Sequence, residues 1–319
     1  MKTKSASQRA RKLARKVILL TITGLTLLTS AAFGTTTIWR VGTRSWFGPA
    51  SWDPGEPDSM TDAQINNGGT AQITLDAGQA VALSLTLGLN PDQWGTVEVS
   101  APHGGLTVGQ AIFIGYRGKG NLVITDGDSV MSASASIASL TNELLPPAQG
   151  SATLNGGGLW TLSGRFDVSG YNDTPGGVAL LNVTNGSTVS AGTVRVYNSG
   201  TLTGNGTVSR ADGMTIDGTL APSGTLTIGG DLSFGANANL RCNVSSTGVD
   251  KAEVSGAATL AGKLSVTLNG FFTGDFTLLH ASTLHGQFGS YSFACTGCLS
   301  PSIRYVNGDV ILHVESTCQ

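Results

Sequence analysis

The stretch IFIGYRGKGNLVITDGDSV (residues 112–130) is followed by a second stretch of the same design, FDVSGYNDTPGGVALLNVTNGSTV (residues 166–189). Each stretch consists of short apolar alternations separated by turns that contain glycine. The interval from Gly127 to Gly186 is longer than the interval from Gly115 to Gly170, so the second copy has four more residues around Pro175. A strand–turn–strand unit repeated at such a period predicts a solenoid, in which each repeat buries its apolar face against the next.

The composition supports a folded chain of many short strands. The 319 residues include 45 Gly, and only 12% are charged and 6% aromatic. Gly and Asn supply the positive φ angles that tight turns require. Disorder is the competing interpretation, but disordered chains are poor in β-branched and aliphatic residues. Val, Ile, Leu and Thr recur throughout this sequence, so we expect an all-β fold.

The N-terminus has the features of a signal peptide. Its basic region contains seven Lys or Arg and no acid, and an apolar run of twelve residues, 17–28, follows it. This run is too short to span a bilayer comfortably. Small residues at 30–34 predict cleavage after Ala32 or Gly34, which makes residues 1–34 a signal peptide. We expect a secreted or cell-surface protein with no membrane span after cleavage; a periplasmic location and an uncleaved anchor are the alternatives.

Removal of this segment would leave an acidic protein. Seven of the 18 Lys and Arg lie in residues 1–34 and none of the 20 Asp and Glu, so 11 positive and 20 negative residues remain, a net charge of −9. Such a chain lacks the basic surface that nucleic acid or anionic lipid requires. The charge also argues against a basic groove for an acidic polysaccharide. Nucleic acid is therefore excluded as a partner.

Residues 35–95 are predicted to form an N-terminal cap and the first coils. Trp39, Trp46 and Trp52 lie within fourteen residues of one another. A solenoid must shield its first coil from water and from edge pairing, and Trp rings can do so because each covers a large apolar area. The alternative is a platform of exposed Trp rings on which a carbohydrate stacks.

Residues 96–240 contain the repeats, and residues 241–319 are predicted to form a C-terminal capping region. Gly200 and Gly218 begin two similar Gly-Thr-Leu runs, and the interval between them is close to one coil of a parallel β-helix. Residues 132–150 interrupt the pattern and suggest a loop that leaves the stack. The longer alternations within residues 250–288 suggest β-hairpins that close the far end.

At this point a family resemblance can be named. Residues 39–68 look like the opening segment of bacterial autotransporter passengers and autotransporter-associated β-strand repeat proteins; GTLTGNGTV (200–208) and GTLAPSGTLTI (218–228) resemble their late-passenger repeats, and residues 250–288 resemble the end at which such passengers begin to fold. The resemblance implies a right-handed parallel β-helix that is extracellular and often adhesive or matrix-forming. Autotransporters also carry a C-terminal outer-membrane barrel of many strands. The stretch from Phe288 to Gln319 is too short for one, so we expect a different secretion route or retention in the periplasm.

The sequence offers little support for catalysis or metal binding. His103, His280, His285 and His313 are scattered and lack the spacing of a helical zinc motif; His280 and His285, five residues apart, are the weak metal candidate. Asp126 and Asp128 could offer carboxylates to calcium, but the second copy has Asn185 and Ser187 at these positions. Asx-Gly is the favoured tight turn in both copies. We therefore assign no catalytic residue, no cofactor and no metal site.

The four cysteines are candidates for disulfide bonds. Cys242, Cys295, Cys298 and Cys318 permit three pairings, and the sequence alone does not choose among them. One of these joins Cys295 to Cys298 in a small loop and leaves Cys242 to pair with Cys318. A redox Cys-x-x-Cys motif is disfavoured because such motifs open a helix in a βαβ unit. An oxidising compartment favours structural disulfides.

Three functional hypotheses follow. The first is a secreted, non-enzymatic β-helical surface or matrix protein, adhesin-like or structural, that works through its side faces and loops, where ladders of Ser, Thr and Asn would supply weak repeated contacts. The second is a glycan-binding or polysaccharide-degrading β-helix protein, which requires acids gathered in one lateral groove. The third is a subunit of a larger assembly. The expected partners are a surface glycan, a protein ligand or further copies of the chain.

Overall fold

The computed structural model describes residues 34–74, 78–100, 104–140, 146–210, 212–295 and 299–317. From Thr35 onward the chain forms one compact unit. Within the described residues there are 33 strands and a short 3₁₀ helix, Pro49–Ser51 (η1), and the strands form three sheets. Residues 1–33 of the predicted signal peptide, His103, Cys298 and Cys318 lie outside the described residues.

The largest sheet has 19 strands. They are β1 (Thr35–Trp39), β3 (Trp52–Asp53), β4 (Thr61–Ile65), β6 (Gln79–Ala82), β7 (Ser84–Leu87), β9 (Gly105–Ile114), β11 (Ser129–Ile137), β13 (Leu159–Leu162), β14 (Arg165–Val168), β18 (Thr188–Ala191), β19 (Thr193–Val196), β21 (Thr207–Arg210), β22 (Met214–Ile216), β24 (Thr225–Gly229), β25 (Leu232–Phe234), β28 (Lys251–Leu260), β30 (Gly274–Gly286), β32 (Leu299–Val306) and β33 (Asp309–Ser316).

The second sheet has 12 strands. They are β2 (Thr43–Ser45), β5 (Thr70–Ile73), β8 (Trp94–Val99), β10 (Lys119–Ile124), β12 (Gln149–Leu154), β17 (Val178–Val183), β20 (Gly200–Gly204), β23 (Thr219–Pro222), β26 (Asn239–Ser245), β29 (Lys263–Asn269) and β31 (Ser290–Ala294), with β27 (Gly248–Val249) paired to β26. A separate two-stranded hairpin consists of β15 (Gly170–Tyr171) and β16 (Thr174–Pro175).

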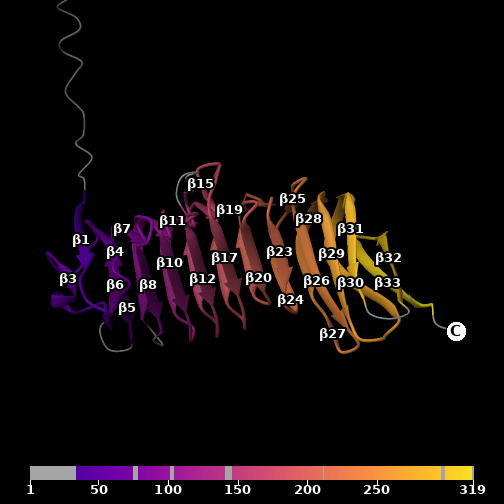
Figure 1. The fold of residues 1–319 in the computed structure, drawn as a ribbon, viewed down its shortest axis with the longest axis horizontal. Coiled ribbons are helices and arrows are strands. Elements are labelled where there is room, and N and C mark those ends of the chain that lie inside the picture. Colours follow the sequence, from indigo (N-terminus) through magenta and orange to yellow (C-terminus); the bar gives the residue numbers. More distant parts are fainter. Residues whose placement is uncertain are drawn as a thin grey trace, which may run out of the picture. The chain divides into compact units, whose positions relative to one another are not determined.

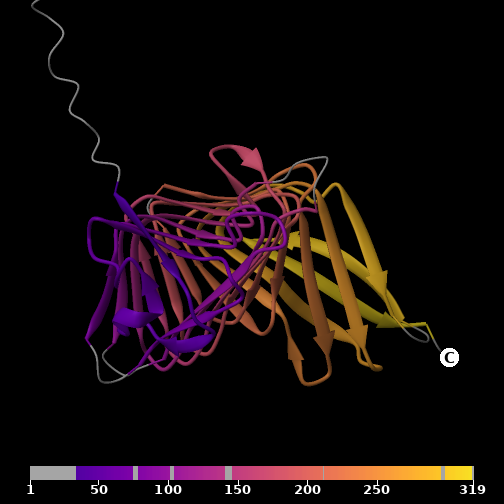
Figure 2. The same ribbon diagram turned by 60° about the vertical axis from the view of Figure 1, so that its left-hand side comes forward.

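A typical coil contributes one strand to the 12-stranded sheet and one strand to each of two ladders in the 19-stranded sheet; in the coils of β9 and β11 a single long strand covers both ladders. In one typical coil the three strands are β17, β18 and β19, and they pair in parallel with β20, β21 and β22 of the next coil. Figure 1 shows the strands of successive coils lying side by side along the stack, and Figure 2 shows the same coils turned towards their ends. The predicted fold, a right-handed parallel β-helix, is confirmed.

The register explains the repeat seen in the sequence. Ile124 of β10 pairs with Leu154 of β12, and Leu154 pairs with Val183 of β17. The two similar stretches therefore lie two coils apart, with the coil that begins at β12 between them. The shorter interval between the two Gly-Thr-Leu runs is one coil, because Leu202 pairs with Leu220. The predicted interruption is shorter than expected, since residues 132–137 belong to β11 and continue the ladder.

The core is a set of aliphatic ladders that run along the stack. One ladder consists of Val97, Leu122, Ala152, Leu181, Leu202, Leu220, Leu240 and Leu264, which are all fully buried. Residues between them along each strand face outward, because side chains alternate across a strand. The Asx-Gly turns also form as predicted, because Asp126 and Gly127 have φ angles of 60° and 81°, and Asn185 and Gly186 have 52° and 78°.

The N-terminal end is closed by the three tryptophans. Trp39 and Trp46 are fully buried, and Trp52 is 3% exposed. The Trp52 ring lies edge-on between the other two, at centroid distances of 4.9 Å from Trp39 and 4.8 Å from Trp46. These rings form the predicted cap and do not form the alternative, an exposed platform for a carbohydrate. Strand β3 pairs antiparallel with β1 and covers one edge.

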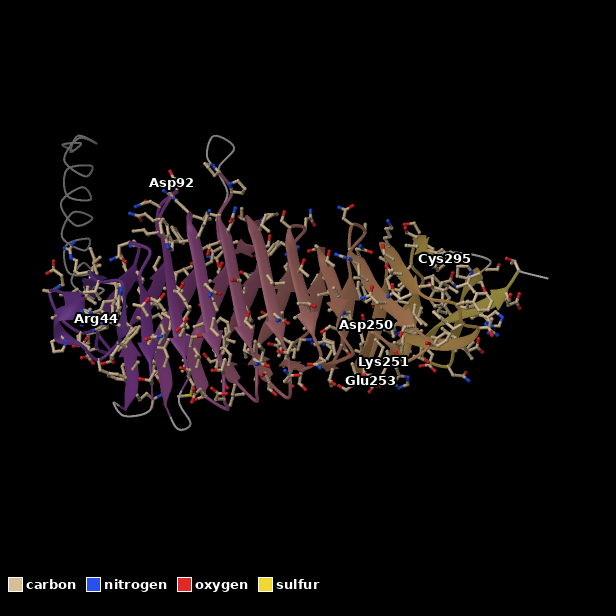
Figure 3. All side chains as sticks on the ribbon, turned by 60° about the horizontal axis from the view of Figure 1, so that its bottom comes forward. Arg44, Asp92, Asp250, Lys251, Glu253 and Cys295 are labelled. Carbon is tan, nitrogen blue, oxygen red and sulfur yellow. The ribbon has the colours of Figure 1, made fainter. Side chains whose placement is uncertain are left out.

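The other N-terminal edge strand, β2, carries a charge at a core position. Arg44 pairs with Ala71 of β5, whose side chain is fully buried. The side chain of Arg44 is exposed at this end of the stack (Figure 3). A charge at the inward position of an edge strand disfavours pairing with a strand of another molecule.

The C-terminal end is closed by antiparallel strands. β32 and β33 form a hairpin, and β33 also pairs antiparallel with β30. The hairpin turns at Asn307 and Gly308, whose φ angles are 47° and 90°. A β-hairpin cap is therefore present, but it lies later in the chain than we expected. Much of residues 250–288 instead continues the parallel coils, because β28 pairs in parallel with both β24 and β30.

A histidine joins two carboxylates across this cap. Nδ1 of His313 lies 2.6 Å from Oδ1 of Asp275, and its Nε2 lies 2.9 Å from Oε1 of Glu315. Arg304 contacts both Asp275 and His313. The hydrogen bonds to Glu315 and then to Asp275 raise the pKa of His313 above its ordinary value of 6.5, although Arg304 opposes this.

We expect the contribution of His313 to the stability of the fold to decrease as the pH rises. A raised pKa in the folded state means that the stabilising contribution of His313 is fully present below about pH 6.5 and is lost as the pH rises through the folded-state pKa. The measurement is an NMR titration of the His313 ring. Glu315→Gln should lower its pKa, whereas Glu98→Gln, on the distant strand β8, should not change it. A His313 pKa at or below 6.5 in the unmodified protein would contradict this expectation.

Candidate functional site

An arginine–aspartate network lies on the outer face of the 19-stranded sheet, where β14 and β19 are adjacent. The alternation that buries Phe166 and Val168 sends Arg165 and Asp167 to the opposite face of β14. Asp167 pairs in register with Arg195 of β19 in the next coil. Because successive coils stack about 4.8 Å apart, outward side chains of adjacent strands come within reach of one another.

Asp167 is the buried centre of this network. Its side chain is 3% exposed. Its Oδ1 accepts a hydrogen bond from Nε of Arg165 at 2.6 Å and a longer one from the hydroxyl of Tyr197 at 3.4 Å. The backbone N–H of Asn172 donates to Oδ2 at 3.2 Å. A buried carboxylate is tolerated when it is paired and hydrogen-bonded in this way.

The β15–β16 hairpin adds a second carboxylate, that of Asp173, to the network. The hairpin projects from the stack in Figures 1 and 2. It places Asp173 against both arginines, with Oδ1 2.8 Å from Nη2 of Arg165 and 3.2 Å from Nη1 of Arg195. Nε of Arg195 donates to Asp217 at 3.0 Å. The guanidinium of Arg195 also lies over the Tyr197 ring, 4.7 Å from its centroid, where cation–π attraction holds it.

The network holds both arginines, Tyr197 and Asp173 in their usual ionisation states at neutral pH. The hydrogen bond to Asp173 raises the pKa of Arg165, and the same bond lowers the pKa of Asp173. Burial lowers the pKa of Arg195, but its contacts with Asp217 outweigh this and the net shift is upward. Burial, and then the charge of Asp167, raise the pKa of Tyr197. The arginines and the phenol therefore stay protonated, and Asp173 stays ionised.

A shallow groove of about 430 Å³ lies beside this network. Its polar lining consists of Arg165, Asp173, Thr193, Arg195, Asp212, Thr215, Asp231 and Ser233. Thr215 pairs in register with Arg195 on one side and with Ser233 on the other, so these side chains form a ladder along the stack.

An aromatic cluster lies on the other side of the hairpin. Phe113 of β9 makes edge-on contacts with Tyr116 and Tyr171, at centroid distances of 5.2 Å and 5.3 Å. Tyr171 belongs to the same hairpin as Asp173. The hairpin therefore contacts the aromatic cluster through one residue and the arginines through another.

The opposite side of the stack, formed by the 12-stranded sheet, has ladders of small polar residues. Ser151 donates to Asn121 at 2.8 Å, and Ser265 donates to Asn239 at 2.9 Å, each across adjacent coils. Figure 3 shows polar side chains along the length of the stack. These contacts are of the predicted kind, but the run is not continuous, because Leu180, which pairs with Ser151 in the next coil, is apolar and 38% exposed.

The sequence reasoning missed the network. The signal was present, because RFDV (165–168) and TVRV (193–196) each place a charged residue at an outward position of a strand. Asp167 and Arg195 are separated by one coil, but coil length varies along the chain, so the pairing could not be derived. The hairpin that carries Asp173 corresponds to the four additional residues of the second repeat.

The predicted metal candidates are not brought together. Nδ1 of His280 lies 2.7 Å from Oδ1 of Asp309, and His285 is exposed further along the same strand. Asp126 and Asp128 occupy the tight turn described above. Within the described ranges, no group of three His, Cys, Asp or Glu side chains is arranged to hold a metal ion.

Cys242 and Cys295 have free thiols and are not bonded to each other. Cys298 and Cys318 lie outside the described residues, so the disulfides that involve them stay predictions. Cys242 faces the core between Leu240 and Val244 on β26, opposite Val266 of β29, and is 2% exposed. A buried thiol of this kind acts as a small apolar side chain. Burial, and then the charge of Asp250, raise the pKa of Cys242. Cys295 is exposed just after β31, near the C-terminal end in Figure 3.

We expect the two thiols to differ in reactivity. The thiolate is the nucleophile, so a buried thiol with a raised pKa resists alkylation. Iodoacetamide should label Cys295 but not Cys242 in the native protein at mildly alkaline pH, and should label both in concentrated urea. Mass spectrometry of proteolytic peptides would locate the label. Equal labelling of Cys242 and Cys295 in the native protein would contradict the position of Cys242 in the core.

Within the part of the chain that the structure describes, no helix has the length and apolar character needed to cross a bilayer. No family model matches the sequence, and a search of curated proteins finds no match either.

Proposed function

We propose that this protein is a secreted, non-enzymatic β-helical surface protein, adhesin-like or structural, that acts through its side faces. The observation that carries the proposal is the network around Asp167. Its arginines and carboxylates lie 2.6 Å to 3.2 Å from one another, and these contacts keep both arginines protonated and Asp173 ionised. A general acid or base works best when its pKa lies near the operating pH. In this network the pKa values of Arg165 and Arg195 are raised and that of Asp173 is lowered, so all three move further from neutral pH.

The same features suit recognition. A rigid set of donors and acceptors, held by mutual contacts, loses little conformational entropy on binding. Small polar side chains on the 12-stranded sheet bond across more than one pair of adjacent coils, so weak contacts with a repetitive partner can add up through multivalency. The three cap tryptophans are buried, so they offer no aromatic surface for binding.

The alternative is a polysaccharide-degrading β-helix protein, and one observation favours it. Asp173, Asp212 and Asp231 line one lateral groove together with two arginines. Clustered acids in a groove are the arrangement that a glycan-cleaving enzyme would require.

One assay separates these functions. The purified protein would be incubated with a panel of polysaccharides, and the release of reducing ends would be measured. We expect no release above that of the double variant Asp212→Asn/Asp231→Asn. Release that this variant abolishes would overturn the non-enzymatic proposal and establish the alternative. A second arm would measure adhesion of protein-coated beads to cell surfaces, and the proposal expects adhesion above that of beads coated with an unrelated protein.

The proposed location is tested separately. Cleavage after Ala32 or Gly34 would give a protein that begins at Phe33 or Thr35. N-terminal sequencing of the protein recovered from the culture medium or the cell surface should find one of these residues. A membrane-bound protein that retains residues 1–34 would instead identify the segment as an uncleaved anchor.

A further inference from the structure

The groove beside the arginine–aspartate network offers a ligand more free hydrogen-bond acceptors than free donors. Nε and Nη2 of Arg165 are already engaged by Asp167, Asp173 and Tyr197. All three nitrogens of Arg195 contact Asp173 or Asp217. The donors that the arginines could offer to a ligand are therefore largely used within the protein.

The free groups at the other rim are mainly acceptors. Among the described residues, the exposed carboxylate of Asp212 has no hydrogen-bond or ion-pair partner, and Asp231 uses only Oδ1, which accepts from the backbone N–H of Ala257 at 2.8 Å. Between the two rims, Thr215 and Ser233 present hydroxyl groups, which can donate or accept. A ligand that suits this groove must bring many donors and must also accept a few hydrogen bonds.

The charges narrow the ligand class. Two arginines and three aspartates line the groove, and the charge of Asp231 also acts on the nearby Arg210, so the groove has no large net charge of either sign. An anionic ligand would be repelled by Asp212 and Asp231, and the guanidinium groups of Arg165 and Arg195 are already engaged by carboxylates. A cationic ligand gains little, because the two guanidinium groups offset most of the carboxylate charge. A neutral polyhydroxyl ligand fits best, since its O–H groups donate to carboxylates in strong charge-assisted bonds.

We propose that the groove between the β15–β16 hairpin and the Asp212–Asp231 rim binds a neutral oligosaccharide through its hydroxyl groups. The proposal rests on the binding function proposed above and names its ligand class. The volume of about 430 Å³ falls in the range of small-ligand sites. The ladder of Arg195, Thr215 and Ser233 offers one polar side chain per coil, about 4.8 Å apart, so a chain of sugar rings laid along the stack meets a polar group at each coil.

The test is a calorimetric binding screen of the purified protein. The probes are neutral hexasaccharides of glucose, xylose, mannose and N-acetylglucosamine, an oligogalacturonate as the acidic probe, and tetralysine as the basic probe. We expect saturable binding of at least one neutral hexasaccharide and none of the oligogalacturonate. Asp212→Asn/Asp231→Asn should raise its Kd at least tenfold, because it removes two charged acceptors while keeping the shape of both side chains.

The matched control is Asp92→Asn. Asp92 is an exposed residue with a φ angle of 65° in the loop between β7 and β8 (Figure 3), and asparagine tolerates that conformation. It should leave the Kd unchanged. Circular dichroism of each variant would establish that it is folded.

The remaining outcomes overturn the proposal. Binding of tetralysine alone would assign the groove to a cationic ligand, and binding of oligogalacturonate alone would assign it to an anion. No binding by any hexasaccharide, or binding that Asp212→Asn/Asp231→Asn leaves unchanged, would reject a saccharide site in this groove. Because reducing-end release and bead adhesion are measured independently, failure here is distinguishable from failure of the proposed surface function.

Discussion

Replacement of Trp52 by alanine is expected to destabilise the N-terminal coils by about 3–5 kcal/mol, the usual cost of removing a buried aromatic ring from a core. Trp52 is 3% exposed and lies between Trp39 and Trp46. Its Nε1 also donates to the backbone carbonyl of Trp46 at 2.8 Å. The substitution would leave a cavity, remove two aromatic contacts and leave that carbonyl without this donor.

Urea unfolding followed by circular dichroism would measure this loss. Trp94→Ala is the matched control, because Trp94 is 54% exposed on β8; it should cost less than about 1 kcal/mol, as most surface substitutions do. A solenoid can also lose its end coils alone, since each coil contacts mainly its neighbours. Hydrogen exchange should then show lost protection in β1, β4 and β5 while later coils stay protected. Equal effects of the two Trp substitutions would contradict a capping role.

Replacement of Arg165 by methionine is the second large expected effect. It removes the guanidinium partner of Asp167, a carboxylate that is only 3% exposed. Removal of one partner of a buried pair costs about 3–5 kcal/mol, because the other charge stays buried without compensation. The side chain of Arg165 is itself 31% exposed, so water can enter the vacated space and we expect a smaller cost, about 2–3 kcal/mol.

A double-mutant cycle separates lost packing from the lost ion pair. Asp167→Asn in the Arg165→Met background removes the buried charge and should recover about 1 kcal/mol or more. The control is Arg40→Met, which breaks a pair with Asp53 in which both side chains are more than half exposed; it should change the free energy of unfolding by less than about 1 kcal/mol. If Arg165→Met lowered the free energy of unfolding as little as Arg40→Met, the burial of Asp167 would not require its ion pair with Arg165.

The network and the groove lie on one side of the stack, and the small polar contacts lie on another. The side formed by the 12-stranded sheet carries small hydroxyl and amide groups that bond across adjacent coils. The side that carries β14 and β19 has the charged residues and the projecting hairpin. A binding function that uses the charged side is therefore separable by mutation from one that uses the polar ladders.

The sequence by itself determined the class of fold and the composition of the core. Side chains alternate strictly across a strand, so a run such as Gly200-Thr-Leu202 already shows which residue faces inward, and its spacing to the run that contains Leu220 matches one coil. Turn chemistry was equally local, because Asp126-Gly127 and Asn185-Gly186 adopt the positive φ angles that such pairs favour. The clustered tryptophans indicated a cap because an end coil must be covered. Cys242 could have been placed in the core by the same alternation, since Leu240 and Val244 flank it at inward positions.

Only the tertiary structure decided which outward residues meet. The separation between partners in adjacent coils is not constant, because the interval along the chain from Asp167 to its partner Arg195 is longer than the interval from Arg195 to its next partner, Thr215. Without a fixed period, the stacking of Arg165, Asp167 and Arg195 into one network cannot be derived from spacing. The hairpin that carries Asp173 is an insertion whose direction depends on the coil beneath it. Inward positions are specified by a local rule of alternation, whereas a lateral site is specified by the register between coils, and that register is set only when the coils stack.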